Sequence, residues 1–376
     1  MSNPSRIVLV SDLHANIRLG MAKVDSGGVS SDRLRDVISV IDQAITHCLE
    51  NNIPSMAILG DLFDIQRPDG ATIVAVCRVL QRAATEGIKT YILPGNHDAV
   101  DRDGRLYNLQ LYNELDLPNI HVFGHESIEL TEGLRLHAVP WLPEARARRR
   151  IRKRARGCSA TDRDVLFLHQ TMLGAVGDAG WVSDGGLDGS ALAGFEYAFS
   201  GHYHKPQVHE WGMYLGSPLH LKFSEGGITA RGFWDVDLAA KVIDPQLVTP
   251  DYPLFDTVNV ELAAGEHLDD YVDDLSEVVG EGVRYLRFIM TGDALAIEAS
   301  RKLLGKWRGE LDKYNLRRIK VDERPERVTR ARLKLTKKTF DLDEAMGAYA
   351  RELAPAGTDH HALAELGKRL LGEART

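Results

Sequence analysis

Short apolar runs that alternate with helical patterns constrain the fold of this chain more than any other feature. Six runs bounded by turn residues predict buried strands: RIVLV (6–10), MAIL (56–59), TYIL (90–93), LRLHAV (134–139), VLFL (165–168) and YAF (197–199). Helical patterns lie between the early runs, at 31–52 and 70–87. Strand–helix–strand alternation implies right-handed crossovers, so we predict an α/β fold with helices covering the sheet.

The pattern changes near residue 250, where the proline-punctuated segment TPDYPLFDT begins. Before it, QVHEWGMYLGSP and RGFWDVDL look like hairpin strands. After it we predict a small separate α/β domain, with strands at 256–262, 283–291 and 316–323 and helices at 267–279 and 294–315. A basic stretch and two short amphipathic helices follow. We therefore predict three regions: 1–250, 251–326 and 327–376.

Composition excludes several classes of protein. The 376 residues are 44% hydrophobic and 27% charged, as in soluble globular chains. No run of eighteen apolar residues is present, so we expect no membrane span, and the first residues do not resemble a signal peptide. Three cysteines without CxxC spacing argue against a disulfide framework and predict a cytoplasmic location. The net charge of −8 gives no hint of nucleic-acid binding by itself.

Side chains that ligate metals follow the predicted strands in five short motifs. In chain order the motifs are SDLHAN with Asp12 and His14, GDLFD with Asp61, GNHD with Asn96 and His97, LHQ with His169, and GHYH with His202 and His204. Open α/β sheets collect their ligands at such strand ends. Any one motif alone is more often an ordinary turn, but five in order predict a site.

The donor types in these motifs indicate which chemistry such a site would do. Oxygen and imidazole ligands without thiolates suit pairs of manganese, iron or zinc ions. Two ions about 3.5–4 Å apart can clamp the attacking and leaving oxygens of a displacement at phosphorus. Such a pair needs a bridging carboxylate, and Asp61 is the natural candidate as the single acid in the LGDLF turn.

The series SDLH…GDLFD…GNHD…LHQ…GHYH resembles the calcineurin-like metallophosphoesterase superfamily. Within it, the chain is most similar to the SbcD nuclease and its archaeal and eukaryotic double-strand-break repair counterparts. The segment YLGSPLHLKFSEGG (214–227) resembles one that SbcD-type chains carry after GHxH. The motifs cover residues 6–240. The resemblance implies a four-layer metallophosphoesterase β-sandwich flanked by helices, a small capping domain and a C-terminal helical tail.

The resemblance also implies roles for the motif residues. Its two ion sites share Asp61: the first takes Asp12, His14, Asp61 and His204, and the second takes Asp61, Asn96, His169 and His202. Manganese is the expected ion. His97 would donate a proton or stabilise charge at the leaving oxygen, and we choose Asp64 as its orienting partner.

Two positions depart from related patterns. Ile65 stands where protein Ser/Thr phosphatases have an arginine that grips a phosphate monoester, which argues against that activity. In SbcD-like chains a glycine follows DxH closely, whereas here HANIRLG places it later. The first loop of the substrate mouth therefore differs.

A phosphodiester in DNA is the substrate that the resemblance implies. The segment RARRRIRKRAR (146–156) has eight basic residues in eleven and could track phosphates, which would make binding steeply salt-dependent. The candidate contacts are Arg148, Arg149, Arg150, Arg152, Lys153 and Arg154. The alternative is a solvated surface helix. A glycine-rich segment at 174–194 follows His169 and could border the substrate channel.

Two further segments suggest partners. LDEAMGAYAREL and HALAELGKRLLGEA carry apolar stripes and would dock on the coiled coil of an SbcC-type ATPase, unless they pack on their own domain. RLYNLQLYNEL (105–115), with four leucines, lies where such nucleases form a homodimer interface. The chain is thus predicted to be the DNA exonuclease and endonuclease subunit of an SbcCD-like complex. The alternatives are a stand-alone small-nucleotide phosphodiesterase and a non-catalytic scaffold.

Overall fold

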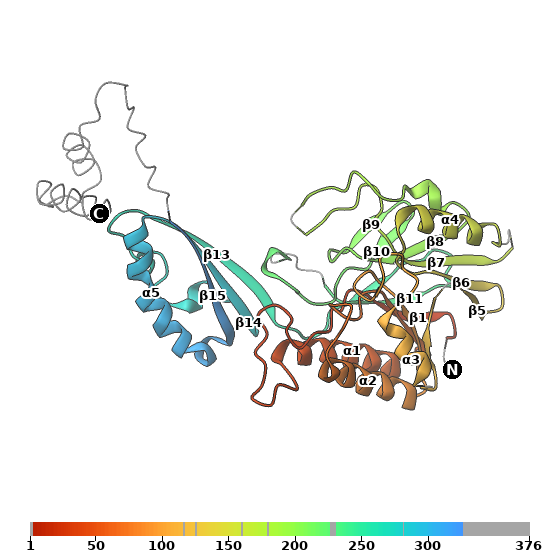
Figure 1. Cartoon of the computed structure of the whole chain (residues 1–376), viewed down its shortest axis with the longest axis horizontal. Helices are drawn as coiled ribbons and strands as arrows, with labels where there is room; N and C mark the ends of the chain where they lie inside the picture. The colour runs from red at the N-terminus through yellow and green to blue at the C-terminus, as the bar shows by residue number, and fades with distance from the viewer. Residues whose placement is uncertain are drawn as a thin grey trace, which may run out of the picture. The chain divides into compact units, whose positions relative to one another are not determined.

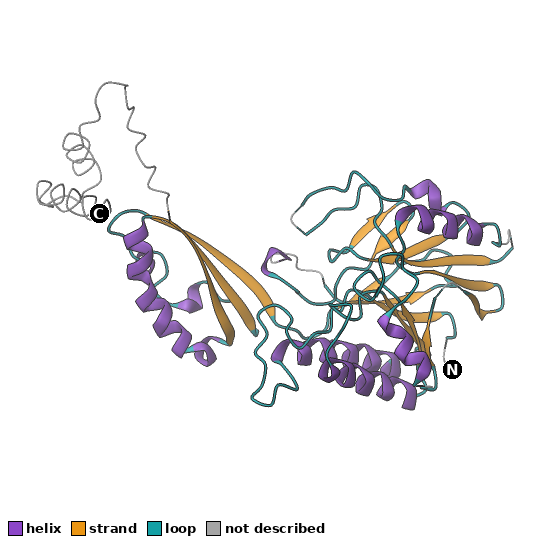
Figure 2. Cartoon of the chain, viewed as in Figure 1, coloured by secondary structure: helices purple, strands orange, loops and turns teal. Residues whose placement is uncertain are grey.

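The computed structural model describes residues 3–115, 117–124, 126–158, 161–178, 180–225, 231–280 and 282–325. The linker and docking helices predicted at 327–376 lie outside these residues. Figures 1 and 2 show two sheets with helices beside them and a third sheet with its own helix. None of the helices in the described ranges is long and apolar enough to cross a bilayer.

The first sheet has six strands in the order β12-β11-β1-β2-β3-β4. Its parallel part comprises β1 (Arg6–Val10), β2 (Ser55–Leu59), β3 (Lys89–Leu93) and β4 (Ile120–Val122). Its antiparallel edge comprises β11 (Phe233–Asp237) and β12 (Gln246–Val248). The helices α1 (Asp32–Glu50) and α2 (Gly70–Thr85) connect the parallel strands as predicted, and Ser31 and Asp69 cap their N-termini.

The second sheet also has six strands, in the order β5-β6-β7-β8-β10-β9. Its parallel core comprises β6 (Leu134–Val139), β7 (Arg163–His169), β8 (Tyr197–Gly201) and β10 (Gly212–Tyr214). The edge strands β5 (Ser127–Thr131) and β9 (Gln207–His209) are antiparallel to their neighbours. The helix α4 (Glu144–Ala155) connects β6 to β7.

Alternating side chains along β1 show how the sheets pack. Ile7 and Leu9 join a core made with β6, β7 and β8 of the second sheet, whereas Val8 and Val10 join a core with α1 and α2. On the outer face of the second sheet, Ile151 of α4 packs against β7 and β8. The order is therefore helices, sheet, sheet, helix, and the predicted α/β sandwich is confirmed.

The third sheet is formed by β13 (Leu254–Leu262), β14 (Arg284–Gly292) and β15 (Leu316–Pro325), all parallel. The helix α5 (Ala294–Gly309) lies between β14 and β15 in the sequence, and this region has a hydrophobic core of its own. The prediction of a helix at 267–279 was wrong. This segment forms two short 3-10 turns, Leu268–Asp270 and Leu275–Glu277. Asp270 completes a capping box at the first turn, and Asp274, in an extended conformation, caps the second turn and so interrupts a continuous helix.

Other local predictions also needed correction. The helix predicted at 294–315 ends at Gly309, and a 3-10 turn (Leu311–Tyr314) follows it. QVHEWGMY does form the β9–β10 hairpin, but RGFWDVDL contributes β11 to the other sheet, beside β1. Strands β4 and β5 were missed because β4 has only three residues and β5 has no fully buried residue.

The proposed dimer segment folds as a 3-10 turn (Asn108–Gln110) followed by the short helix α3 (Leu111–Glu114). Leu109 and Tyr112 are buried within their own chain. Leu106 and Leu115 are about half exposed, at 52% and 50%. These two leucines are therefore the apolar side chains that the segment presents to solvent.

Candidate metal centre

The five motifs meet where the C-terminal ends of strands from both sheets come together. Asp12, Asp61 and Asn96 follow β1, β2 and β3 of the first sheet. His169 ends β7, and His202 follows β8 of the second sheet. Because the sandwich stacks these strand ends, side chains far apart in sequence form one cluster.

The backbone is held in an unusual conformation at four of these positions. Asp12, His14, Asp61 and His202 have φ values of 53°, 50°, 51° and 99°. Residues with side chains rarely adopt positive φ, and such strain is typical of sites where the fold aims a side chain. Position 95 has no room for a side chain, because a Cβ on Gly95 would lie within 3.0 Å of the Asp61 carboxylate.

Two groups of three donor atoms consist entirely of predicted metal ligands. Asp12, His14 and His204 make one, and Asp61, His169 and His202 make the other; the ligand atoms of each group lie within 4.8 Å of one another.

Asp61 lies between the two groups. Its Oδ2 is 3.3 Å from His169 Nε2 and 3.7 Å from His14 Nε2. Asn96 Oδ1 contacts the second group, at 2.8 Å from His202 Nδ1 and 3.2 Å from His169 Nε2. The shared carboxylate connects the groups as a bridging ligand would.

These residues fit a pair of divalent cations. His14 Nε2 is buried, and no hydrogen-bond partner for it is present among the described residues. Buried polar atoms are normally satisfied, so this nitrogen suits a metal ligand. The donor set of carboxylate, amide oxygen and imidazole, without thiolates, matches manganese, iron or zinc better than calcium or magnesium.

Burial and close charges shift several pKa values within the cluster. Burial opposes ionisation of Asp61, but the neighbouring His169 and His14 outweigh it and hold the pKa of Asp61 far below its usual range. Burial would lower the pKa of His169, but Asp61 raises it to about 9. For His202, burial and the nearby His169 lower the pKa to about 3. Without an ion, positive charge therefore concentrates beside Asp61.

Glu225, which forms a buried ion pair with Arg231, contacts Nδ1 of His204. Glu225 Oε1 lies 3.0 Å from His204 Nδ1, and Glu225 Oε2 lies 3.1 Å from Arg231 Nη2; Glu225 and Arg231 are both fully buried. Arg231 also donates to the main-chain carbonyls of His204 and Ser217. Burial works against the imidazolium, but bonds to Asp178 and Glu225 raise the pKa of His204 to about 10. Asp178 Oδ2 is 3.5 Å from His204 Nδ1.

His97 belongs to neither of these two groups, but one of its ring nitrogens lies within 4.8 Å of donor atoms of His14 and Asp64. Its Nδ1 donates a 2.6 Å hydrogen bond to the main-chain carbonyl of Asp64. The Asp64 carboxylate, which we expected to orient His97, contacts His14 Nδ1 at 3.2 Å and Asn16 Nδ2 at 2.9 Å. The side chain of Asp64 thus orients a candidate ligand, and its main chain orients His97. An open cavity of about 610 Å³ lies next to His97 and includes Ile65 and Arg67.

Sequence reasoning missed four supporting residues: Asp98, Asp178, Glu225 and Arg231. Asp98 is fully buried and accepts from the main-chain N–H groups of Gly95 and Phe63, which ties the GNHD turn to the GDLFD turn. Burial and the nearby Asp61 raise the pKa of Asp98 to about 7. Three of them lie in segments that the sequence had already singled out: Asp98 ends the GNHD motif, Asp178 lies in the glycine-rich segment 174–194, and Glu225 lies in the segment that resembles SbcD-type chains.

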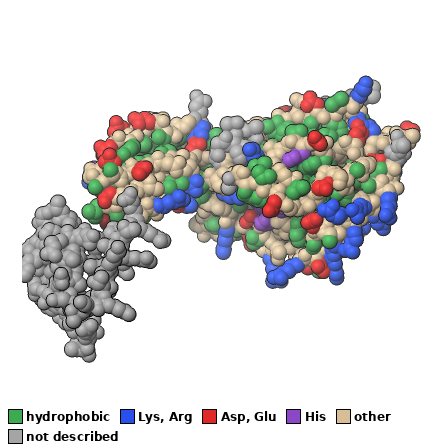
Figure 3. All heavy atoms as spheres, turned by 90° about the horizontal axis from the view of Figure 1, so that it is seen from above, with side chains coloured by type: hydrophobic (Ala, Val, Ile, Leu, Met, Phe, Trp, Pro, Cys, Tyr) green, Lys and Arg blue, Asp and Glu red, His purple; other side chains and the backbone are tan. Residues whose placement is uncertain are grey.

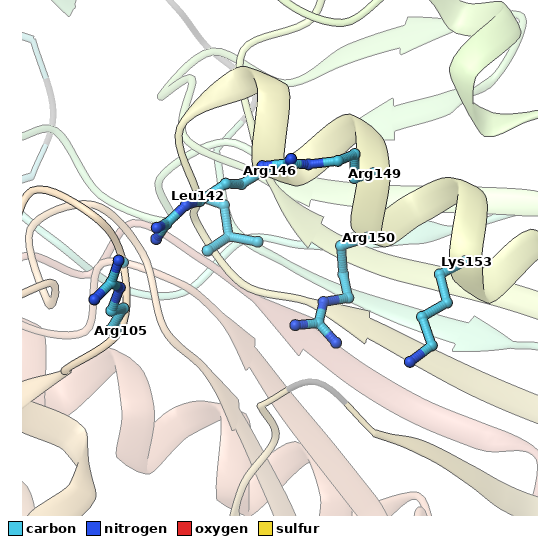
Figure 4. A pocket seen from close by; sticks show the side chains of 7 residues that line it. Arg105, Leu142, Arg146, Arg149, Arg150 and Lys153 are labelled. Atoms are coloured by element: carbon cyan, nitrogen blue, oxygen red, sulfur yellow. The ribbon is translucent and has the colours of Figure 1, made fainter.

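The predicted basic segment forms α4, and part of it lines a cavity. Arg146, Arg149, Arg150 and Lys153 surround a space of about 600 Å³ together with Arg105 (Figure 4). Arg150 and Lys153 extend from the helix in the same direction in this view. Lys and Arg side chains gather at the side of the molecule on which α4 lies (Figure 3).

The remaining predicted contacts on α4 lie around that cavity rather than in it. Arg148 pairs with Glu144 at 3.0 Å, and Arg154 donates to Ser127. Arg152 is exposed. The helix is not basic all round, because Ala147 and Ile151 are buried.

Two α/β sheets stacked between helices, with carboxylates and imidazoles at their strand ends, define a protein of the metallophosphoesterase class. Residues 5–206, more than half of the chain, match the model of the calcineurin-like phosphoesterase family. The chain therefore belongs to this family, whose members use divalent metal ions.

Several known proteins are similar to this chain in sequence or in structure. The chain is 24% identical to the DNA double-strand break repair protein Mre11 of Saccharolobus solfataricus over 61% of this chain and 58% of that protein. It is also 24% identical to the protein of the same name from Methanopyrus kandleri, over 62% of this chain and 54% of that protein. The match thus spans little more than half of these relatives. A dimetal phosphatase from Danio rerio aligns in structure with a TM-score of 0.41 and 11% identity, over 64% of this chain and 96% of that one.

Proposed function

We propose that this protein is a metal-dependent DNA phosphodiesterase that serves as the nuclease subunit of an SbcCD-like repair or recombination complex. The observation that carries the proposal is the pair of donor groups joined by Asp61 at the strand ends of two stacked sheets. Membership of the phosphoesterase family and similarity to proteins named Mre11 support DNA as the substrate. Exonuclease activity and endonuclease activity on hairpins or ends are the proposed reactions.

The proposed ligands divide between two ions, with Asp61 shared. Asp12, His14, Asp61 and His204 would hold one, and Asp61, Asn96, His169 and His202 the other. When bound, such a pair polarises a phosphodiester and activates water as the nucleophile. Four imidazole ligands favour manganese over magnesium.

In this proposal His97 protonates the leaving oxygen. A carbonyl can only accept, so Nδ1 of His97 must carry the proton of the bond to Asp64. Nε2 is consequently the nitrogen that can carry the transferred proton. With the ring fixed through Nδ1, protonated Nε2 can donate to the leaving oxygen as a general acid.

The test is metal-dependent digestion of hairpin, blunt duplex and single-stranded DNA, with elemental analysis of the purified protein. We expect two ions per chain, cleavage that is best with manganese and lost in chelator, and no cleavage by Asp61→Asn or His204→Ala. His121→Ala, an exposed histidine on β4, is the matched control and should cleave normally. Hydrolysis of a nitrophenyl phosphodiester without cleavage of any DNA would instead indicate a small-nucleotide phosphodiesterase.

We further propose two protein partners. The exposed Leu106 and Leu115 support a homodimer through 105–115, to be tested by sedimentation of the Leu106→Glu variant. The helices predicted after residue 338 would dock on the coiled coil of an SbcC-type ATPase. Truncation after Lys338 should then leave thermal stability and nitrophenyl-diester hydrolysis unchanged while co-purification with the ATPase is lost. A large loss of stability would show that these helices pack on their own chain.

A further inference from the structure

The loop between β7 and β8 is held in a defined shape. We call residues 171–178 and 180–187 the rim loop. The N–H of Gly174 donates to the carbonyl of Ser183 at 2.9 Å, and the N–H of Gly177 donates to the carbonyl of Trp181 at 2.9 Å. The Gln207 side chain bonds both the N–H and the carbonyl of Val176, at 2.7 and 2.8 Å. The rim loop is thus a braced hairpin.

The tip of the rim loop lies at the candidate metal centre. Asp178 is 3.5 Å from Nδ1 of His204, one of the proposed ligands. The same carboxylate is 2.9 Å from Nζ of Lys222, which offsets its negative charge. The loop therefore borders the place where a phosphodiester would react.

Trp181 on this loop exposes an unusually large aromatic surface. It is 55% exposed, whereas the other four tryptophans of the chain are partly or fully buried. Its ring lies 5.9 Å from that of Tyr203, the residue between His202 and His204. On another side it lies against Gly177, where a Cβ would come within 3.0 Å of the indole. The indole is thus supported by its own chain and still open to solvent.

An aromatic ring held in this way beside a metal centre suits a nucleobase. Bases stack on exposed aromatic side chains whatever their sequence, because each base has a π-face. Within a duplex the neighbouring base pairs cover both faces of each interior base, so an unpaired base is more accessible for stacking than a paired one. Among the exposed apolar side chains of the rim loop, Leu173 and Val182 offer no ring.

We propose that Trp181 stacks on an unpaired base of the strand that enters the metal centre, so that the site takes single-stranded DNA or a frayed end. This inference rests on the proposed DNA phosphodiesterase function and deepens it. The basic cavity beside α4 would bind phosphates of any sequence or strandedness. Trp181 adds a preference for an unpaired base.

The experiment measures binding of the full-length protein in chelator, where no cleavage occurs. The probes are oligothymidine, an abasic oligomer with the same phosphates, and a blunt duplex. Stacking of one base is worth about 5- to 150-fold in affinity. We expect Trp181→Ala to weaken oligothymidine binding within that range and to leave abasic binding unchanged. Trp181→Phe should bind nearly as the wild type does, because it keeps an aromatic face.

Intrinsic fluorescence gives a second measurement that reports on the ring itself. Oligothymidine should quench wild-type fluorescence, and the abasic oligomer should not. Trp181→Phe should lose this quenching while it keeps the affinity. Leu173→Ala, which removes an exposed aliphatic side chain from the same loop, is the matched control and should keep both.

Three results would overturn the inference. They are wild-type affinity of Trp181→Ala for oligothymidine, equal weakening on the abasic oligomer, and a changed oligomeric state of Trp181→Ala, which would make the ring a self-association contact. Failure of the proposed function looks different, because then the wild type would cleave no DNA with manganese present. The binding measurements test the role of Trp181, and the cleavage measurement tests the proposed phosphodiesterase activity.

Discussion

At the scale of single residues, the main chain and the side chain of Asp64 contact different residues of the site. The carbonyl of Asp64 fixes the tautomer of His97, while its carboxylate contacts His14 and Asn16. Substitution of the Asp64 side chain should therefore act on the metal centre through His14. Substitution of His97 should act on the chemical step.

His97→Ala should bind two ions as the wild type does and lose about 10²–10⁴-fold in kcat, the usual contribution of a general acid. Asp64→Asn should instead weaken metal binding by about 10- to 100-fold, as expected when the partner of a metal-ligating histidine is altered. Calorimetric titration with manganese and kcat at saturating metal separate the two effects. Loss of metal from His97→Ala would make His97 a ligand, and unchanged metal affinity of Asp64→Asn would remove Asp64 from the site.

Glu225 and Arg231 form a fully buried ion pair behind His204, so removal of one charge leaves the other unpaired. Glu225→Gln should lower the free energy of unfolding by about 3–5 kcal/mol, the usual cost of breaking such a pair. The double variant Glu225→Gln with Arg231→Met removes both charges and should recover part of that loss. Denaturant unfolding of metal-free protein gives the values. Equal stability of the single variant and the wild type would contradict this account.

At the scale of elements, α4 shows how one helix can be both part of the core and a binding surface. Ala147 and Ile151 pack against the second sheet, and the basic residues face outward. Among the described residues, no ion pair joins Arg149, Arg150 or Lys153 to a carboxylate, so these charges are available to phosphates.

Arg149→Ser, Arg150→Ser and Lys153→Ser together should weaken duplex binding and reduce the salt slope by up to about 3, because each lost phosphate contact removes roughly 0.9. Hydrolysis of a nitrophenyl diester should stay unchanged. Arg150→Ser can be compared with Arg156→Ser, the same charge change at the C-cap of α4 and outside the cavity. An equal effect of these two single variants would show that general charge, not the cavity, sets the affinity.

At the scale of the whole molecule, the two sheets share one site. Asp12, Asp61 and Asn96 come from the first sheet, and His169, His202 and His204 come from the second. Ions bound between them would link the sheets, so we expect metal binding to stabilise the fold.

Manganese should raise the melting temperature of chelator-treated protein in a concentration-dependent way, because a ligand that binds only the native state stabilises it by RT ln(1 + [L]/Kd), about 2.7 kcal/mol at 100 times Kd. His204→Ala should show a smaller rise than the wild type at the same manganese concentration. Thermal scans over a metal series give the result. The control is His121→Ala, which should behave as the wild type does; a melting temperature independent of manganese would contradict coupling through the site.

The sequence by itself determined the α/β class, the positions of the early strands and helices, and the residues that gather at the strand ends. Local patterns suffice for these, because strand and helix periodicities are properties of short segments and each motif directly follows its strand. The periodicity does not reveal the break at 267–279, where Asp274 adopts an extended conformation and caps a second short turn.

Only the tertiary structure decided which other residues contact the proposed metal ligands. The contact of Glu225 and Asp178 with His204 joins residues up to 26 positions apart, and the bond between Asp98 and Phe63 joins residues 35 positions apart. No periodicity encodes such pairs, because they depend on how two sheets stack. Packing also decided that the carboxylate of Asp64 contacts His14 while its carbonyl contacts His97. It likewise placed Trp181 beside Tyr203, because packing sets the direction of a side chain once neighbouring elements are in contact.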